Sequence, residues 1–178
     1  MRCPLQLDPH ADGRKLPKAP ILEVRMDGSE DDVALIRRWF QHLQMRVQAV
    51  DFEGAKPLFA EDMITFGTFA AFVIGREETE QEQWRNVWGR IDGFRWALDD
   101  LRVIISSDRL TAVGMAVFQS TGYSEDGEPY DRPGRATIVL SRDAIGREWV
   151  AQHTHMSLFR NVPTRSFGSR RRVHAERP

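Results

Sequence analysis

Residues 149–159 read Trp-Val-Ala-Gln-His-Thr-His-Met-Ser-Leu-Phe, a segment of the length and residue types typical of a β-strand. In an extended strand alternate side chains share one face, so His153, His155 and Ser157 are expected on the same face as Trp149. Two imidazoles and a hydroxyl in a row need hydrogen-bond partners if they are buried. This face is therefore a candidate for a functional site.

Composition indicates one globular domain with short tails. The 178 residues are 41% hydrophobic and 29% charged, with a formal net charge of -1, which favours neither nucleic acid nor membrane as a partner. Cys3 is the only cysteine, so no intrachain disulfide can form. The sequence has no signal-peptide pattern and no apolar run near the roughly 20 residues of a membrane span. We expect a cytoplasmic protein.

Helical patterns dominate the first half of the chain. Ser29 is a candidate N-cap, and acidic residues follow it in the first turn. An apolar stripe with helical spacing then predicts a helix of about 20 residues. The stripe consists of Val33, Ile36, Phe40, Leu43, Val47 and Val50. Asp51 can cap a short second helix, and residues 77–90 predict a third one, with a short hairpin over residues 63–74 between them.

The second half of the chain is rich in β-prone segments separated by turn signals. The segments are residues 94–106, 110–123, 135–142 and 148–160. Short links between these strands favour an antiparallel meander. Helices followed by strands predict an α+β domain, with the helices on one face of a curved sheet. Residues 1–28, which contain four prolines, are expected to form an extended or poorly ordered arm with 21–26 as a possible edge strand. Residues 29–160 form the domain, and residues 161–178 a basic tail.

This order of elements, ending in Trp-x3-His-x-His-x-Ser, resembles the nuclear transport factor 2-like superfamily. Within it, the chain is similar to SnoaL-like domains and to the association domain of calcium/calmodulin-dependent protein kinase II. The resemblance covers roughly residues 30–160. The matching residues are Trp149, His153, His155 and Ser157, together with Asp51-Phe52-Glu53 and Arg142-Asp143.

The resemblance implies a cone-shaped α+β fold, in which helices and a curved, mostly antiparallel sheet enclose a pocket. It also implies a homodimer through the sheet, or a larger homo-oligomer. It does not imply one activity, because the superfamily includes isomerases, cyclases, dehydratases and assembly domains. Since the histidines carry the superfamily motif, we predict that their face points into the pocket.

Two positions depart from better-known members of the superfamily. Steroid isomerases use a tyrosine in the helical region as oxyanion donor, whereas residues 30–50 contain none and the two tyrosines are Tyr123 and Tyr130. The kinase association domain lines its pocket with arginines, whereas the corresponding strands here carry Phe118 and Thr137. An arginine-lined pocket for an acidic ligand is therefore not expected.

Four residues are candidates for acid–base chemistry. His153 and His155 titrate near neutrality, and an inward Asp99 or Asp100 could pair with one of them. The alternative is that both histidines are structural and that both aspartates are solvated at a strand end. Two histidines at positions i and i+2 lack an obvious third ligand, so neither a metal nor a cofactor is predicted.

Aromatic side chains are the main candidates for binding a ligand. The predicted ligand-binding residues are Trp39, Phe66, Trp84, Trp88, Trp96, Phe118 and Ser157. The alternative for the aromatic residues is a role in the core alone.

Two hypotheses of function follow from the sequence. The first is a SnoaL-like protein that binds a small, mainly apolar organic molecule, with possible isomerase- or lyase-like acid–base chemistry and no metal. The second is a non-catalytic homo-oligomeric association domain.

Overall fold

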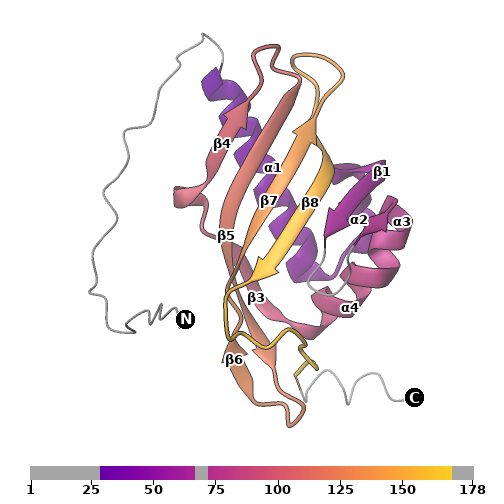
Figure 1. The fold of residues 1–178 in the computed structure, drawn as a ribbon, viewed down its shortest axis with the longest axis vertical. Helices are drawn as coiled ribbons and strands as arrows, with labels where there is room; N and C mark the ends of the chain where they lie inside the picture. Colours follow the sequence, from indigo (N-terminus) through magenta and orange to yellow (C-terminus); the bar gives the residue numbers. More distant parts are fainter. Residues whose placement is uncertain (1–28, 67–71, 170–178) are drawn as a thin grey trace, which may run out of the picture.

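One long helix lies across the inner face of a curved sheet in the computed structural model, which describes residues 29–66 and 72–169 (Figure 1). This helix, α1, spans Ser29–Ala49 and confirms the helix predicted from the apolar stripe. Its buried face comprises Ile36, Trp39, Phe40, Leu43 and Val47. Both ends of the predicted stripe are less buried, because Val33 is exposed and Val50 follows the helix with a φ of 52°.

Short helical segments follow α1 on the same side of the sheet. Asp51 caps α2 (Phe52–Ala55) by accepting a hydrogen bond from the Gly54 N–H at 2.8 Å. A 3₁₀ turn then covers Lys56–Leu58. The predicted third helix is a continuous run over 76–90, made of α3 (Arg76–Thr79), a π turn (Glu80–Trp84), α4 (Arg85–Val87) and a 3₁₀ turn (Trp88–Arg90).

The sheet is mostly antiparallel, as predicted. Its strands are β1 (Phe59–Phe66), β2 (Val73–Ile74), β3 (Asp92–Trp96), β4 (Arg102–Ile105), β5 (Thr111–Tyr123), β6 (Pro129–Asp131), β7 (Gly134–Ser141) and β8 (Val150–Leu158). The main order is β2-β1-β8-β7-β5-β3, and β4 and β6 also pair with β5. Only the β1–β8 pair is parallel among the described strands.

Some segments differ from the sequence-based prediction. The single segment expected over 94–106 is split into β3 and β4 by a 3₁₀ turn at Leu98–Asp100, and β6 was not predicted. The possible edge strand at 21–26 lies outside the described residues. Residues 161–169 contain no helix or strand, but they are docked: Ser166 accepts a hydrogen bond from the Tyr123 N–H and donates one to the Arg90 carbonyl.

A β-bulge in β8 determines which side chains face inward. Val139 of β7 pairs with His153, but the next residue, Leu140, pairs with Ala151, so β8 contains one extra residue, Gln152. A bulge breaks the alternation of side chains along a strand. Trp149 and Ala151 are therefore buried before the bulge, whereas the opposite set of positions faces inward after it.

A buried ion-pair cluster fixes the N-terminal end of α1 to two hairpins. The Asp32 carboxylate lies 2.7 Å from Arg109 Nε and 2.8 Å from Arg142 Nη2. The Arg142 side chain has no exposed surface, and its guanidinium lies 4.3 Å from the centre of the Trp149 ring. Burial of Asp32 opposes ionisation, but the two guanidinium groups outweigh it and hold the pKa of this carboxyl below its usual value.

Candidate functional site

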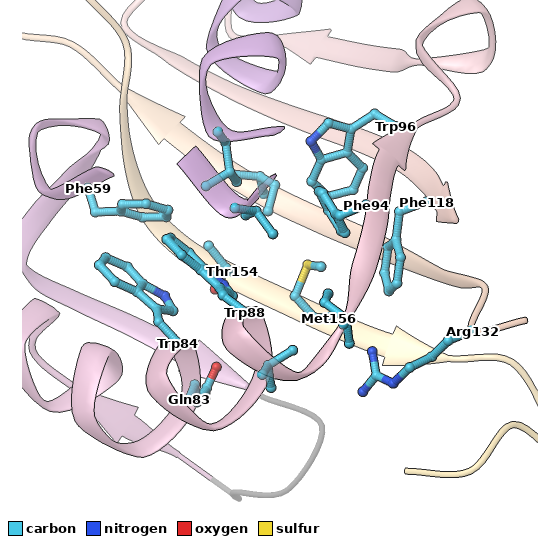
Figure 2. Close-up of a pocket in the computed structure, with 15 residues that line it drawn as sticks. Phe59, Gln83, Trp84, Trp88, Phe94, Trp96, Phe118, Arg132, Thr154 and Met156 are labelled. Carbon is cyan, nitrogen blue, oxygen red and sulfur yellow. The ribbon is translucent and has the colours of Figure 1, made fainter. Parts of the chain in front are cut away.

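A cavity of about 90 Å³ lies between the inner face of the sheet, the second half of α1 and the helical run over 76–90 (Figure 2). Its wall is mainly apolar. The apolar lining residues are Leu43, Val47, Phe59, Trp84, Val87, Trp88, Ile91, Phe94, Trp96, Phe118, Ile138 and Met156. Gln83, Arg132 and Thr154 complete the lining.

Six of the fifteen lining residues are aromatic, and their rings hold one another in place. Trp84 and Trp88 are stacked, with ring centres 5.0 Å apart and planes inclined by 16°. Residues four apart lie on one face of a helix, which explains why both indoles reach the cavity. On the opposite side, the Phe118 ring contacts Phe94 at 5.5 Å and Trp96 at 5.8 Å, measured between ring centres. Offset and edge-to-face pairs of this kind give a rigid apolar surface.

The π turn brings a polar side chain beside the stacked indoles. Gln83 and Trp84 are consecutive, yet both are buried and both line the cavity. π turns are rare and occur frequently at functional sites. Glu80 anchors the same turn, because its buried carboxylate pairs with Lys56 and Arg85. Burial opposes ionisation of Glu80, but these two cations outweigh it and keep the pKa of its carboxyl below the usual value.

Polar groups enter the cavity at a few points. The Thr154 hydroxyl lies 2.6 Å from the Thr65 hydroxyl, so this polar group has a partner within the protein. Three buried nitrogens of lining residues have no hydrogen-bond partner among the described protein atoms: Arg132 Nε, Gln83 Nε2 and Trp96 Nε1. Such groups are costly to bury unpaired, which marks them as potential ligand contacts.

Four of the predicted ligand-binding residues lie in the cavity wall, and three lie elsewhere. Trp84, Trp88, Trp96 and Phe118 line the cavity. Trp39 is buried behind the wall, where its indole N–H donates to the Leu58 carbonyl at 3.0 Å. Phe66 and Ser157 lie on the outer face of the sheet, where Phe66 contacts His153 and Ser157 accepts a hydrogen bond from Arg135 Nε at 3.2 Å.

The prediction that the histidine face of β8 points inward is wrong. Thr154 and Met156 line the cavity, so His153 and His155 project from the opposite face. Their rings lie 5.4 and 5.5 Å from the Phe66 ring centre on the outer side. The bulge at Gln152 is the physical reason, because it reverses the alternation between Ala151 and His153.

Asp99 and Asp100 do not reach the cavity either. One of them was considered as an inward carboxylate, but both are exposed in the 3₁₀ turn Leu98–Asp100. Asp100 lies 4.0 Å from Arg102 Nη2 at the surface. The two aspartates and the two histidines are therefore not brought together into one acid–base site.

Eleven of the fifteen lining residues were not among the predicted ligand-binding residues, and four of these are important for the shape and polarity of the site: Gln83, Arg132, Thr154 and Met156. Thr154 and Met156 lie on the face of β8 opposite to the histidines. They were not identified because the histidine face was expected to point inward. Arg132 comes from the link between β6 and β7, so the strand positions compared in the sequence did not reveal it.

Two further observations concern metal ions and membranes, in the part of the chain that the structure describes. No group of three or more His, Cys, Asp or Glu side chains there could hold a metal ion. No helix in residues 29–66 and 72–169 is long and apolar enough to cross a membrane.

Comparisons with known proteins agree on the fold. The model of the SnoaL-like domain family matches residues 33–161. No curated protein matches the chain. Among solved structures, a ketosteroid isomerase-like protein from Erwinia carotovora atroseptica is similar, with 12% identity and a TM-score of 0.61, covering 72% of this chain and 97% of that one.

Two further structures represent other branches. The association domain of calcium/calmodulin-dependent protein kinase II from C. elegans has 21% identity and a TM-score of 0.57, covering 74% of this chain and 99% of that one. A nuclear transport factor 2-like superfamily protein from Salmonella enterica serovar Typhimurium has 15% identity and a TM-score of 0.61, covering 73% and 92%. At these low sequence identities, the similarity shows a shared fold and nothing further.

Proposed function

The chain belongs to the SnoaL-like domain family, and from that premise we propose that it binds a small, mainly apolar organic molecule in the aromatic cavity. The observation that carries this proposal is the cavity of about 90 Å³ walled by the stacked indoles of Trp84 and Trp88 and by Trp96 and Phe118. An apolar pocket with a few convergent polar groups is the usual form of a small-molecule site.

The size of the cavity argues against an incidental packing defect. Protein interiors are packed almost as densely as organic crystals, and a void of about 10–15 Å³ already accommodates one water molecule. A larger side chain at Met156 or Val87 would fill part of the space. On each side of the cavity the aromatic rings pack against one another, which supports a preformed binding site.

The geometry favours binding without acid–base catalysis by the cavity wall. Among the described lining residues, Arg132 is the only one with an ionisable side chain. An arginine stays protonated at neutral pH and cannot serve as a general base there. The acid–base role considered for His153 and His155 is therefore left out of the proposal.

Filling the cavity should weaken ligand binding strongly. We expect an aromatic probe such as 2-naphthamide or 2-naphthoate to quench the emission of the wall tryptophans, and Met156→Trp to weaken that binding at least tenfold, about 1.4 kcal/mol, by occupying the space. Val87→Trp, from the helical wall, is a second blocking variant. Fluorescence titration measures the affinity, and thermal unfolding verifies that each variant is folded.

His155→Gln is the matched control, because this neighbour of Met156 projects from the outer face of the same strand. Its affinity for the probes should equal that of the wild type. If neither probe binds the wild-type protein at concentrations up to about 1 mM, or if both blocking variants fold and retain full affinity, the proposal is rejected.

A second candidate function, homo-oligomeric association, is supported by an apolar patch on the outer face of β1, β2 and β8. We define the outer-face patch as Ile64, Phe66, Phe72, Ile74, His153 and His155. Phe72 is 65% exposed and Ile74 is 68% exposed. The Phe66 ring contacts those of Phe72, His153 and His155. Contiguous exposed apolar surface of this kind often marks an interface.

Charging the outer-face patch should disrupt association. If the protein is a homodimer, Ile74→Lys should yield a monomer of about half the mass by light scattering, because a buried unpaired ammonium opposes an apolar interface. Ile104→Lys, which replaces another exposed isoleucine on β4, should leave the mass unchanged. Wild-type protein that runs as a monomer at micromolar concentration would exclude this function.

A further inference from the structure

Arg132 is a buried cation at the edge of the aromatic cavity. The residue is 2% exposed. Two hydrogen bonds with Ser120 fix its backbone. The Arg132 N–H donates to the Ser120 carbonyl at 2.7 Å, and the Ser120 hydroxyl donates to the Arg132 carbonyl at 2.9 Å. The link between β6 and β7 is therefore held in place. The side chain has little freedom to move its charge into water.

Among the described residues, only uncharged groups compensate the guanidinium: the Tyr130 side chain and a backbone carbonyl. Its Nη2 donates to the Thr164 carbonyl at 3.2 Å, and its Nε has no hydrogen-bond partner among the described atoms. No carboxylate of the described residues forms an ion pair with Arg132, and the adjacent Asp131 is exposed. Burial lowers the pKa of the Arg132 guanidinium below its usual value, yet arginine stays charged at neutral pH. Buried charges are normally paired, so this one lacks its expected counter-charge.

The side chain is directed at the cavity. Figure 2 shows the guanidinium of Arg132 extending toward the space bordered by Met156 and Phe118, with Gln83 on the opposite side of that space. Trp96 also lines the cavity, and its indole N–H has no partner among the described protein atoms. One cation, one indole donor and one amide thus belong to residues at separate points around an otherwise apolar space (Figure 2). This set suits a ligand that combines an apolar body with oxygen acceptors and a single negative charge.

We propose that the ligand is a small aromatic carboxylate, with its ring against the indoles of Trp84 and Trp88 and its carboxylate paired with Arg132. This inference rests on the proposed binding function of the cavity and adds the chemical class of the ligand. A guanidinium presents N–H donors in a fork that matches a carboxylate, and such charge-assisted hydrogen bonds are stronger than neutral ones. A neutral ligand would occupy the same cavity but leave the buried cation unpaired.

The charge of the site distinguishes a carboxylate from more highly charged anions. Arg132 is the single cation among the described lining residues, and Gln83 and Trp96 contribute only uncharged donors. A phosphate monoester carries a charge near -2 at neutral pH and would stay undercompensated in this apolar space. One negative charge on two oxygens matches one guanidinium.

The test compares isosteric probes on the wild-type protein. Isothermal titration calorimetry measures the dissociation constants of 2-naphthoate and 2-naphthamide. The constant for 2-naphthoate should be at least tenfold lower than that for 2-naphthamide, because a charge-assisted pair replaces a neutral contact. Equal affinities would overturn the carboxylate assignment and leave the binding function standing. Failure of both probes to bind would reject the binding function, and the carboxylate assignment with it.

Variants of the arginine test the role of its charge. Arg132→Met keeps the length of the side chain and should abolish the preference, reducing the ratio of the two dissociation constants to about one. Arg132→Lys should retain a reduced preference. Arg135→Met, which changes an exposed arginine three residues later, should behave as the wild type. Loss of the preference in Arg135→Met, or its full retention in a folded Arg132→Met, would contradict the assignment.

Discussion

Replacing Asp32 by asparagine is expected to lower the free energy of unfolding by about 3 kcal/mol, because breaking a buried ion pair leaves an uncompensated charge. The charge left behind is Arg142, whose side chain has no exposed surface. Arg109, the second partner, is partly exposed and can turn to water, so Arg142 accounts for most of the loss. Urea unfolding measures the difference, and an unchanged m-value would show that the unfolding reaction is the same.

Asp31→Asn is the matched control, because Asp31 is exposed and precedes Asp32 directly. It should change stability by no more than about 0.5 kcal/mol, the usual range for surface substitutions. The pH dependence provides an independent check. The pKa of Asp32 in the folded protein lies below the unfolded value of about 3.9. The contribution of Asp32 to the free energy of unfolding is therefore fully present above that pH, and it is lost as the pH falls through the folded pKa. A loss of stability in Asp32→Asn no greater than in Asp31→Asn would disprove the role of the cluster.

Gly134→Ala is expected to cost about 3 kcal/mol, at the upper end of the range for overpacking. A Cβ at this position would lie 2.6 Å from the Ser157 carbonyl oxygen of β8 and 2.3 Å from Phe118 Cζ. The first is a backbone atom of a neighbouring strand, so relief requires β7 and β8 to separate. The second belongs to the cavity wall, so the substitution should also weaken binding of the aromatic probes.

Gly89→Ala serves as the control for Gly134→Ala. A Cβ on Gly89 meets no described atom within 4 Å, and the residue lies in the 3₁₀ turn Trp88–Arg90. Stability should stay the same or rise by about 0.4–1 kcal/mol, because alanine restricts the unfolded chain. Thermal and urea unfolding compare the two variants. Equal stability of Gly134→Ala and the wild type would mean that the two strands tolerate a wider spacing.

Local patterns predicted the parts of the fold in which one face is continuously apolar. The stripe from Ile36 to Val47 gave α1, and the alternation along β5 gave a long strand whose inward side chains include Ala112, Ala116 and Phe118. The β6 strand escaped prediction because three residues carry too little periodicity. The π turn also escaped prediction, because a widened helical turn has no sequence signature comparable to a cap or a proline.

The candidate site was predicted only where it coincides with aromatic residues on regular elements. Trp84, Trp88, Trp96 and Phe118 are conspicuous from residue type alone. The histidine face of β8 was chosen from the superfamily motif, and its placement on the same face as Trp149 assumed unbroken alternation, which a single inserted residue such as Gln152 invalidates. Arg132 has no local marker, because its burial depends on β5 and on the docked segment around Thr164, both remote from it in the sequence.

The Asp32 cluster and the Arg132 cavity occupy opposite ends of the molecule. The first joins the start of α1 to the β4–β5 and β7–β8 hairpins, and the second lies toward β6 (Figure 1). Effects of substitutions at separated sites on stability usually add. The stability that the Asp32 cluster contributes should therefore offset part of the loss caused by a substitution in the cavity wall, which gives the scaffold a margin for changes there.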